Sequence, residues 1–361
     1  MIDRSKRRRV MVGNVPIGGC APISIQSMTT TPTTNISATR DEIKRLEDVG
    51  CDIVRVSVPD MDSARAVEKI ISQANIPIVA DIHFDYRIAL AALDTGIAKL
   101  RINPGNIGAR ERVEKVVAKA KERNVPIRIG VNAGSLEKDL LEKHGFPTPE
   151  ALVESAMRHV AILEALDFTD IVLSLKSSAV PLTVSAYRLV VKACDYPLHI
   201  GISEAGPEQS GVIYSSVGLG ILLSEGIGDT MRVSLTANVE EEVKVAKRIL
   251  AALEIQSSMP RVISCPTCAR NCLDLFSLAE EVERRTSDLK IPISIAVMGC
   301  AVNGPGEARE ADFGIAGGDG EGLIFAKGKI LRKVREKDLV DELEKEIRLH
   351  LEKDAESGKD C

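Results

Sequence analysis

The sequence predicts an α/β fold: a TIM (β/α)8 barrel followed by a smaller α+β domain. Eight short β-branched runs alternate with longer segments whose apolar residues recur three and four positions apart. These runs occupy about 250 residues, the usual size of a TIM barrel, and several helical segments end on a glycine suited to a C-cap, such as Gly50 and Gly96. An open, doubly wound sheet with fewer strands is the competing fold. The runs begin at Ser24, Ile53, Ile76, Lys99, Pro126, Asp170, Leu198 and Asp229.

The segments on either side of the barrel have patterns of their own. Before it, two short strands are expected around the turn dipeptide Gly13-Asn14. The barrel pattern stops near Ala252. We therefore expect a substrate domain at 1–254 and a second domain at 255–361.

The second domain is predicted to be α+β. The segment 255–263 is expected to lead into a strand, a helix follows from Ser277, another strand begins at Ile291, and a hairpin turns around 317–322. A last helix carries an apolar stripe that would pack on the small sheet. The tail ending in Cys361 is expected to fray, so Cys361 is not expected to bind a metal. The apolar stripe consists of Leu339, Leu343, Ile347 and Leu351.

Composition argues against several classes of protein. The 361 residues are 44% apolar, with a net charge of −5 and no tryptophan, which does not favour a nucleic-acid-binding or membrane-binding surface. The apolar runs are too short to cross a bilayer, and the N-terminal segment is charged without an apolar signal region. Eight cysteines that cluster late in the chain fit metal or redox use in a reducing compartment. We therefore expect a cytoplasmic protein.

Charged and polar residues recur toward the carboxyl ends of the predicted strands. Residues two apart share a face of a strand, so Asp81 and His83 point together, as do Lys99 and Arg101. Four arginines and a lysine converging at the barrel mouth would be costly to desolvate without a polyanion. Arg forks match phosphate oxygens in pairs, so we infer a phosphorylated or diphosphorylated small substrate; the alternative is a ring of salt bridges with Asp81 and Glu204. The converging residues are Arg55, Asp81, Arg101, Arg128, Asn132, Lys176, Glu204, Arg232 and Ser234.

The second domain contains a cysteine pattern typical of a metal site. Cys265 and Cys268 form a C-P-T-C pair that can turn both sulfurs toward one metal, and Cys300 returns on a glycine-rich loop. Iron–sulfur clusters usually have four thiolate ligands, and here Glu307 is the natural fourth candidate. A carboxylate is a harder, more exchangeable ligand, which would expose an iron to substrate. Spacing alone leaves open a structural zinc site, a fourth sulfur from Cys272, or buried free cysteines.

The order of these motifs resembles one enzyme family. C-P-T-C is followed by M-G-C-A-V-N-G-P-G-E, and the barrel contains A-D-I-H-F, R-I-N-P-G-N and I-G-V-N-A-G-S. Over essentially the whole chain the sequence is similar to the 4-hydroxy-3-methylbut-2-enyl diphosphate synthases of the methylerythritol phosphate route to isoprenoids. The resemblance implies the two-domain bacterial layout and a cluster domain similar to those of sulfite and nitrite reductases. It also implies a [4Fe–4S] cluster held by Cys265, Cys268, Cys300 and Glu307; Cys272 lies outside the family pattern.

The same resemblance implies a reaction, site residues and partners. The family carries out a two-electron reductive ring opening and dehydroxylation of 2-C-methyl-D-erythritol 2,4-cyclodiphosphate, in which Glu204 would be the acid beside the cluster. Flavodoxin or ferredoxin would be the electron donor, and the chain would form a homodimer in which one subunit's cluster domain caps the other's barrel. The diphosphate would be held by Arg55, Arg101, Arg128, Lys176, Arg232 and Ser234, with Asp81 and Asn132 assisting.

Two other functions fit parts of the pattern. A barrel aldolase or lyase would use Lys176 as a Schiff-base amine on a phosphorylated substrate and the cysteines as ligands of a structural zinc. A non-catalytic iron or redox sensor would use the cluster as a switch and would not need the cationic barrel mouth. Borohydride trapping of substrate on Lys176 would favour the first, and phosphate-ester binding would count against the second.

Overall fold

The computed structural model describes residues 2–103, 107–256, 259–269, 271, 273–300, 308–318 and 320–357, with side chains to residue 352. The chain divides into two compact units, Met1–Gln256 and Ser257–Cys361. No helix in the described part of the chain is long and apolar enough to cross a membrane.

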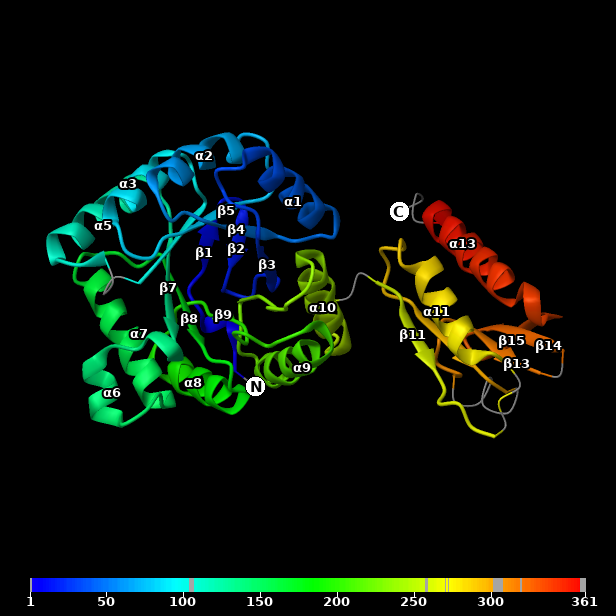
Figure 1. Cartoon of the computed structure of the whole chain (residues 1–361). Helices are drawn as coiled ribbons and strands as arrows, with labels where there is room; N and C mark the ends of the chain where they lie inside the picture. The colour runs from blue at the N-terminus through cyan, green and yellow to red at the C-terminus, as the bar shows by residue number, and fades with distance from the viewer. Residues whose placement is uncertain are drawn as a thin grey trace. The chain divides into compact units, whose positions relative to one another are not determined.

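The first unit is a barrel of parallel strands surrounded by helices (Figure 1). Its strand order is β8-β7-β6-β5-β4-β3-β10-β9, and a parallel bridge between Leu173 and Leu198 links the two ends of this order. All eight predicted strands are present, so the TIM-barrel prediction is confirmed. The strands are β3 (Ser24–Met28), β4 (Ile53–Ser57), β5 (Ile78–Asp81), β6 (Lys99–Ile102), β7 (Ile127–Asn132), β8 (Ile171–Lys176), β9 (His199–Ile200) and β10 (Thr230–Met231).

The outer helices each bury one apolar face against these strands. In α2, for example, Ala64, Val67 and Ile70 are buried. Gly50 and Gly96 follow α1 and α3 with φ of +79° and +89°, the left-handed conformation expected at a helix C-terminus. The helices of this unit are α1 (Ile36–Asp48), α2 (Met61–Ile71), α3 (Tyr86–Asp94), α5 (Arg110–Arg123), α6 (Lys138–His144), α7 (Pro149–Glu164), α8 (Val180–Ala193), α9 (Glu208–Ser224) and α10 (Val239–Ala252).

The predicted N-terminal hairpin is confirmed, and it covers the amino end of the barrel. Strands β1 (Val10–Val12) and β2 (Val15–Ile17) pair antiparallel around the predicted turn. Val12 and Ile17 pack in one buried cluster with Ile53 and Val79, which lie near the starts of β4 and β5. The amino end is therefore filled with apolar side chains, and the opposite end remains for a site.

In its described residues, the second unit is a five-stranded sheet with two helices packed on one face. Its order is β11-β12-β13-β14-β15, with the first three strands parallel. Leu339, Leu343 and Ile347 of the last helix are buried against this sheet, as predicted, and the hairpin turns where Gly317 pairs with Gly322. The elements are β11 (Arg261–Ser264), α11 (Leu275–Thr286), β12 (Ser294–Met298), β13 (Phe313–Gly317), β14 (Glu321–Ala326), β15 (Lys329–Arg335) and α13 (Leu339–Ser357).

Candidate active site

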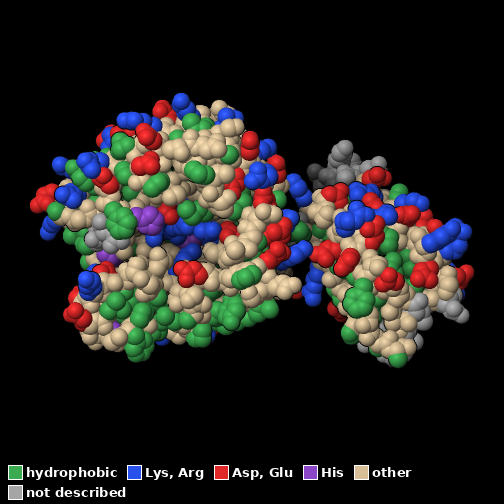
Figure 2. All heavy atoms as spheres, viewed as in Figure 1, with side chains coloured by type: hydrophobic (Ala, Val, Ile, Leu, Met, Phe, Trp, Pro, Cys, Tyr) green, Lys and Arg blue, Asp and Glu red, His purple; other side chains and the backbone are tan. Residues whose placement is uncertain are grey.

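A cavity of about 730 Å³ lies at the carboxyl ends of the barrel strands. Figure 2 shows Lys and Arg side chains gathered in a hollow of the first unit. All nine candidate site residues of the barrel line this cavity, although the roles assigned to these residues stay predictions. They are Arg55, Asp81, Arg101, Arg128, Asn132, Lys176, Glu204, Arg232 and Ser234.

The barrel interior below the cavity is polar. TIM barrels usually fill it with branched apolar side chains, whereas here it contains buried Gln26, Lys99, Arg128 and His199. Lys99 is the first residue of β6 and does not line the cavity, so its predicted place at the carboxyl end of the strand is wrong. Arg128 is the second residue of β7, and it lines the cavity because its side chain is long.

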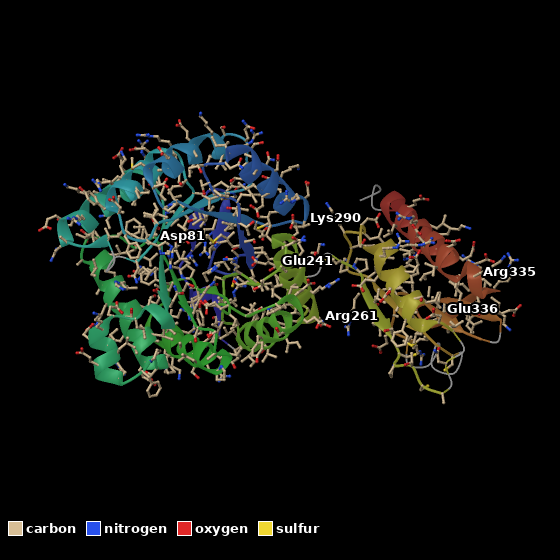
Figure 3. All side chains as sticks on the ribbon, in the orientation of Figure 1. Asp81, Glu241, Arg261, Lys290, Arg335 and Glu336 are labelled. Atoms are coloured by element: carbon tan, nitrogen blue, oxygen red, sulfur yellow. The ribbon has the colours of Figure 1, made fainter. Side chains whose placement is uncertain are left out.

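Asp81, which Figure 3 labels in the first unit, pairs with two of the arginines. Its Oδ1 accepts a hydrogen bond from Arg101 Nη1 at 2.9 Å, and its Oδ2 lies 3.4 Å from Arg55 Nε. Burial raises the pKa of Asp81, but Arg55 and Arg101 outweigh burial and hold that pKa below its usual value. Burial is the main cause that lowers the pKa of Arg55 to about 10. Asp81 thus remains ionised and fixes two guanidinium groups at the cavity wall.

Glu242 of α10 fixes a third guanidinium. Its carboxylate accepts hydrogen bonds from Arg232 Nε and Nη2, both at 3.1 Å, from Ser27 Oγ at 2.9 Å and from the Leu235 backbone N–H at 3.1 Å. Glu242 is only 3% exposed. A buried, bidentate pair of this kind holds the guanidinium in one orientation, so the predicted salt-bridge ring exists in part but uses Glu242 in place of Glu204.

Arg128 and Lys176 make no ion pair with a carboxylate in the described part of the chain. The Nε atoms of Arg128 and Arg101 are buried without a hydrogen-bond partner. Burial, followed by repulsion from neighbouring cations, lowers the pKa values of Arg128 and Lys176 well below their usual range. Buried donors without partners cost about 1–3 kcal/mol each. A bound anion would supply acceptors for them.

Two glycines leave room for these cations. A Cβ on Gly130 would lie 3.0 Å from Arg101 Nε, and a Cβ on Gly201 would lie 2.7 Å from the Arg232 backbone carbonyl oxygen and 2.8 Å from Lys176 Nζ. Neither glycine has a positive φ, so side-chain space, and not backbone freedom, explains the residue type. A larger residue would need space that is taken by the Arg101 guanidinium at Gly130, and by the Arg232 backbone and Lys176 Nζ at Gly201.

Glu204 lies at the exposed rim of the cavity, in the loop after β9. Its φ of +54° is in the left-handed region, which is unusual for a residue other than glycine. Hydrogen bonds hold the loop on both sides: the Ser203 N–H donates to Ser177 O at 3.1 Å, and the Thr236 N–H donates to Gly206 O at 3.0 Å. The loop therefore holds a carboxyl group at the cavity entrance.

Sequence reasoning missed three residues of this arrangement. Glu242 shares the buried face of α10 with Val239, Val243 and Ala246, and a charged residue on an apolar stripe is the signal that could have revealed it. Met28, whose sulfur lies 2.9 Å from Arg55 Nη2, looks like an ordinary strand residue. His199 also gave no signal, because one histidine in an apolar run resembles a core residue.

The cysteines of the second unit are only partly described. Cys265 and Cys300 follow the adjacent parallel strands β11 and β12, in which Ser264 pairs with Val297. The Gly299 N–H donates a hydrogen bond to Cys265 Sγ at 3.3 Å, which fixes the position of this sulfur. The two sulfur donors therefore belong to one end of the sheet.

Of the other predicted ligands, one is exposed and one lies outside the described residues. Cys268 is exposed, and no group of three or more His, Cys, Asp or Glu side chains within the described ranges could hold a metal. The predicted ligand Glu307, as well as Cys272 and Cys361, lies outside the described residues. Cys265 and Cys300 are free thiols, and thiolates are the usual ligands of an iron–sulfur cluster.

The fold and the cavity define a TIM-barrel protein with a cationic mouth and a C-terminal domain that carries cysteines. Residues 7–247 match the GcpE TIM-barrel domain, and residues 261–349 match the GcpE protein C-terminal domain. The chain belongs to the GcpE family.

Curated relatives of the chain share one name. A Brevibacillus brevis protein is 58% identical over 347 residues, which are 96% of this chain and 96% of that protein. A Clostridium perfringens protein is 57% identical over 346 residues, 96% of this chain and 99% of that protein. Both are named 4-hydroxy-3-methylbut-2-en-1-yl diphosphate synthase (flavodoxin).

Among solved structures, the spore coat polysaccharide biosynthesis protein spsE from Bacillus subtilis is similar in fold. It has a TM-score of 0.50 and 11% sequence identity, and the match covers 68% of this chain and 73% of that one. At this identity the likeness supports the fold alone.

Proposed function

We propose that this chain catalyses the reductive ring opening and dehydroxylation of 2-C-methyl-D-erythritol 2,4-cyclodiphosphate to 4-hydroxy-3-methylbut-2-enyl diphosphate in isoprenoid biosynthesis. The observation that carries this proposal is the cavity, in which buried guanidinium and ammonium groups exceed the carboxylates in the described residues. The relatives in Brevibacillus and Clostridium carry the name of this synthase, which favours it over an aldolase with a Schiff base on Lys176.

The barrel residues bind the diphosphate and orient it. Arg101 and Arg55 are held by Asp81, and Arg232 is held by Glu242, so their free N–H groups are preorganised for phosphate oxygens. Arg128 and Lys176 add charge without a carboxylate to neutralise them in the described residues. Asn132 and Ser234 supply neutral donors at the cavity wall.

The reaction breaks two C–O bonds, takes up two electrons and releases one water. Glu204, at the rim, donates the proton that converts the departing hydroxyl to water. The diphosphate gains one negative charge when the ring opens, and the cationic cavity stabilises that charge.

A [4Fe–4S] cluster, when bound, would supply the electrons one at a time. Its ligands would be Cys265, Cys268, Cys300 and Glu307. The cluster domain would thus be residues 255–361, and residues 1–254 would form the substrate domain. The name of the relatives mentions flavodoxin, so a flavodoxin, or a ferredoxin of similar potential, would reduce the cluster. We place the reaction in the cytoplasm, a reducing compartment in which the cysteines stay available to bind a cluster.

A homodimer, in which the cluster domain of one subunit caps the barrel of the other, would bring the two halves of the site together. The outer surface of α9 supports association of barrels, because Ile213, Tyr214 and Val217 are 64%, 53% and 50% exposed. They line an apolar groove with Val180 and Val184 of α8. Exposed apolar groups gathered in this way are typical of a protein interface.

Metal analysis and turnover test the proposal together. Protein purified without oxygen should contain about four irons and four sulfides per chain, and with a reductant it should convert the cyclodiphosphate to the open-chain diphosphate. A colourless protein that contains zinc would contradict the cluster assignment. Borohydride trapping of substrate on Lys176 would contradict the reaction and favour the aldolase.

A further inference from the structure

Two buried basic side chains, one of which lines the cavity, meet at its floor. Lys176 Nζ, at the end of β8, lies 3.4 Å from His199 Nε2, on the neighbouring β9. Lys176 is 8% exposed and His199 is fully buried. The second imidazole nitrogen, Nδ1, lies 3.5 Å from Thr230 Oγ1. An ammonium can donate a hydrogen bond to a neutral imidazole, but two cations at this distance would repel each other. The pair therefore carries at most one positive charge.

The fold builds a fixed position for the ammonium. His199 and Gly201 are two residues apart, and a Cβ on Gly201 would lie 2.8 Å from Lys176 Nζ. The Lys176 side chain and the Arg232 backbone carbonyl, which would lie 2.7 Å from that Cβ, together fill the space beside Gly201. The Tyr187 hydroxyl donates to His199 O at 2.6 Å and accepts from the Leu175 N–H at 3.1 Å, which fixes the two strands relative to each other.

The charges around the pair are almost all positive. Asp81 already pairs with Arg55 and Arg101, and Glu242 already pairs with Arg232. In the described part of the chain, neither Lys176 nor His199 makes an ion pair with a carboxylate. The charged and titratable groups that act on the pair are Arg55 on β4, Lys99 and Arg101 on β6, Arg128 on β7 and Arg232 after β10, with Tyr187 of α8 packed behind.

Burial and these neighbours disfavour protonation of the empty site. Burial is the largest cause that lowers the pKa values of both Lys176 and His199 well below their usual values, and repulsion from Arg128 and Arg55 adds to it for both groups. A bound dianion would reverse the local potential, because opposite charge nearby favours the protonated form of an amine.

We propose that Lys176 and His199 act as a coupled proton-accepting pair that takes up one proton from solvent when the cyclic diphosphate binds. The lone pair of Lys176 Nζ or of His199 Nε2 forms the new N–H bond with a proton from solvent, and no oxidation or reduction takes place. The inference rests on the proposed function, since it concerns the ligand of the same cavity. His199 is then a positioning residue, which acts on the substrate through Lys176.

Proton uptake makes binding dependent on pH. Where the empty pair is unprotonated and the occupied pair is protonated, the dissociation constant should rise about tenfold for each unit of increasing pH. The cyclic diphosphate suits this measurement because its two phosphate hydroxyls are strongly acidic and remain ionised at neutral pH. The ligand therefore contributes no proton change of its own.

Calorimetry of the full, cluster-loaded chain tests the inference. The cyclodiphosphate is titrated at pH 8 without reductant, so that it cannot turn over, in buffers of different ionisation enthalpy. The dependence of the observed heat on that enthalpy gives the number of protons taken up. We expect about one proton for the native chain, and uptake near zero for the double variant Lys176→Met with His199→Gln.

Control variants separate the pair from the rest of the cavity. Lys244→Met removes an exposed lysine that pairs with Glu241 on α10, and it should keep the full uptake. Replacing a buried lysine that has no carboxylate partner in the described residues breaks no ion pair, so Lys176→Met should fold. His199→Gln keeps an acceptor for Lys176 and should bind the ligand with a flatter pH dependence than the native chain.

The outcomes distinguish the inference from the proposed function. Binding by the native chain without proton uptake would overturn the inference alone. Full uptake in the double variant would also overturn it, because another group would then accept the proton. A native, cluster-loaded chain that did not bind the cyclodiphosphate would overturn the proposed function and the inference together.

Discussion

Single side chains in the barrel cavity are held by partners that lie on other elements. Arg232 follows β10, yet its orientation depends on Glu242 of α10, and Arg101 depends on Asp81 of β5. The guanidinium groups could be predicted from strand alternation in the sequence. Strand alternation does not reveal Glu242, the partner of Arg232, because Glu242 lies on a helix, where side chains follow a different period.

Glu242→Gln should weaken substrate binding. The variant removes the charge that holds Arg232, so the KM for the cyclodiphosphate should rise about tenfold, equivalent to about 1.4 kcal/mol, with a smaller change in kcat. Breaking a buried ion pair should also lower the free energy of unfolding by about 3 kcal/mol. Steady-state kinetics and denaturant titration measure the two effects. Glu241→Gln, which affects an exposed pair with Lys244, is the control, and an unchanged KM for Glu242→Gln would contradict the positioning role.

Glu204→Gln should separate binding from turnover. The amide cannot donate a proton as an acid does, so kcat should fall about a hundredfold, while the dissociation constant of the substrate changes little. Single-turnover kinetics with prereduced protein measure the effect. Glu208→Gln, at the exposed start of α9, is the matched control. Near-normal turnover of Glu204→Gln would remove Glu204 from this role.

At the scale of elements, loops after the strands are fixed by buried carboxylates. Glu42 of α1 accepts hydrogen bonds from the backbone N–H groups of Thr30 and Thr31 at 3.0 and 3.1 Å, and from their hydroxyls at 2.7 and 2.8 Å. Burial raises the pKa of Glu42, but these hydrogen bonds outweigh burial and hold the pKa below its usual value. The carboxylate therefore fixes the loop between β3 and α1.

Glu42→Gln should destabilise the barrel in a pH-dependent way. The folded state lowers the pKa of Glu42, so the stabilisation is complete at neutral pH and is lost as the pH falls below about 4 toward the folded-state pKa. We expect a loss of about 2 kcal/mol at pH 7, measured by urea unfolding, and a smaller difference from the native chain at pH 3. Asp41→Asn on the exposed face of α1 serves as control. A difference that does not depend on pH would contradict this account.

Elements were predicted unevenly. The barrel strands and the N-terminal hairpin follow from β-branched runs and turn residues. Strand β15 was missed because its sequence, K-I-L-R-K-V-R, alternates charged with apolar residues only in part, and most of its side chains are exposed. An edge strand has one paired neighbour and little buried area, so its sequence carries a weak signal.

At the scale of the whole molecule, the proposed reaction requires that the cavity of one compact unit and the cysteines of the other act together. The units meet in sequence at residues 256 and 257. A head-to-tail homodimer would solve this problem, because each barrel would receive a cluster domain from the second copy.

Mixing two inactive variants tests the dimer. A Cys300→Ala chain keeps an intact barrel, and a Glu204→Ala chain keeps intact cysteines, so each alone should be inactive. After subunit exchange at equal concentration, about a quarter of the sites should combine an intact barrel with an intact cluster domain. Turnover measured before and after exchange shows this recovery. No recovery in confirmed mixed dimers would indicate that each chain supplies both halves of its own site.

The sequence by itself determined the barrel, the cationic residues at its mouth and the C-P-T-C pattern, because strand alternation and motif spacing are local properties of the chain. Only the tertiary structure decided which carboxylate pairs with which arginine and that Lys99 lies below the cavity. It also decided that Lys176 Nζ contacts His199 beside Gly201. The reason is physical. Pairing, burial and the charge that a basic group can carry depend on neighbours from other strands, and the order of residues along the chain does not specify those distances.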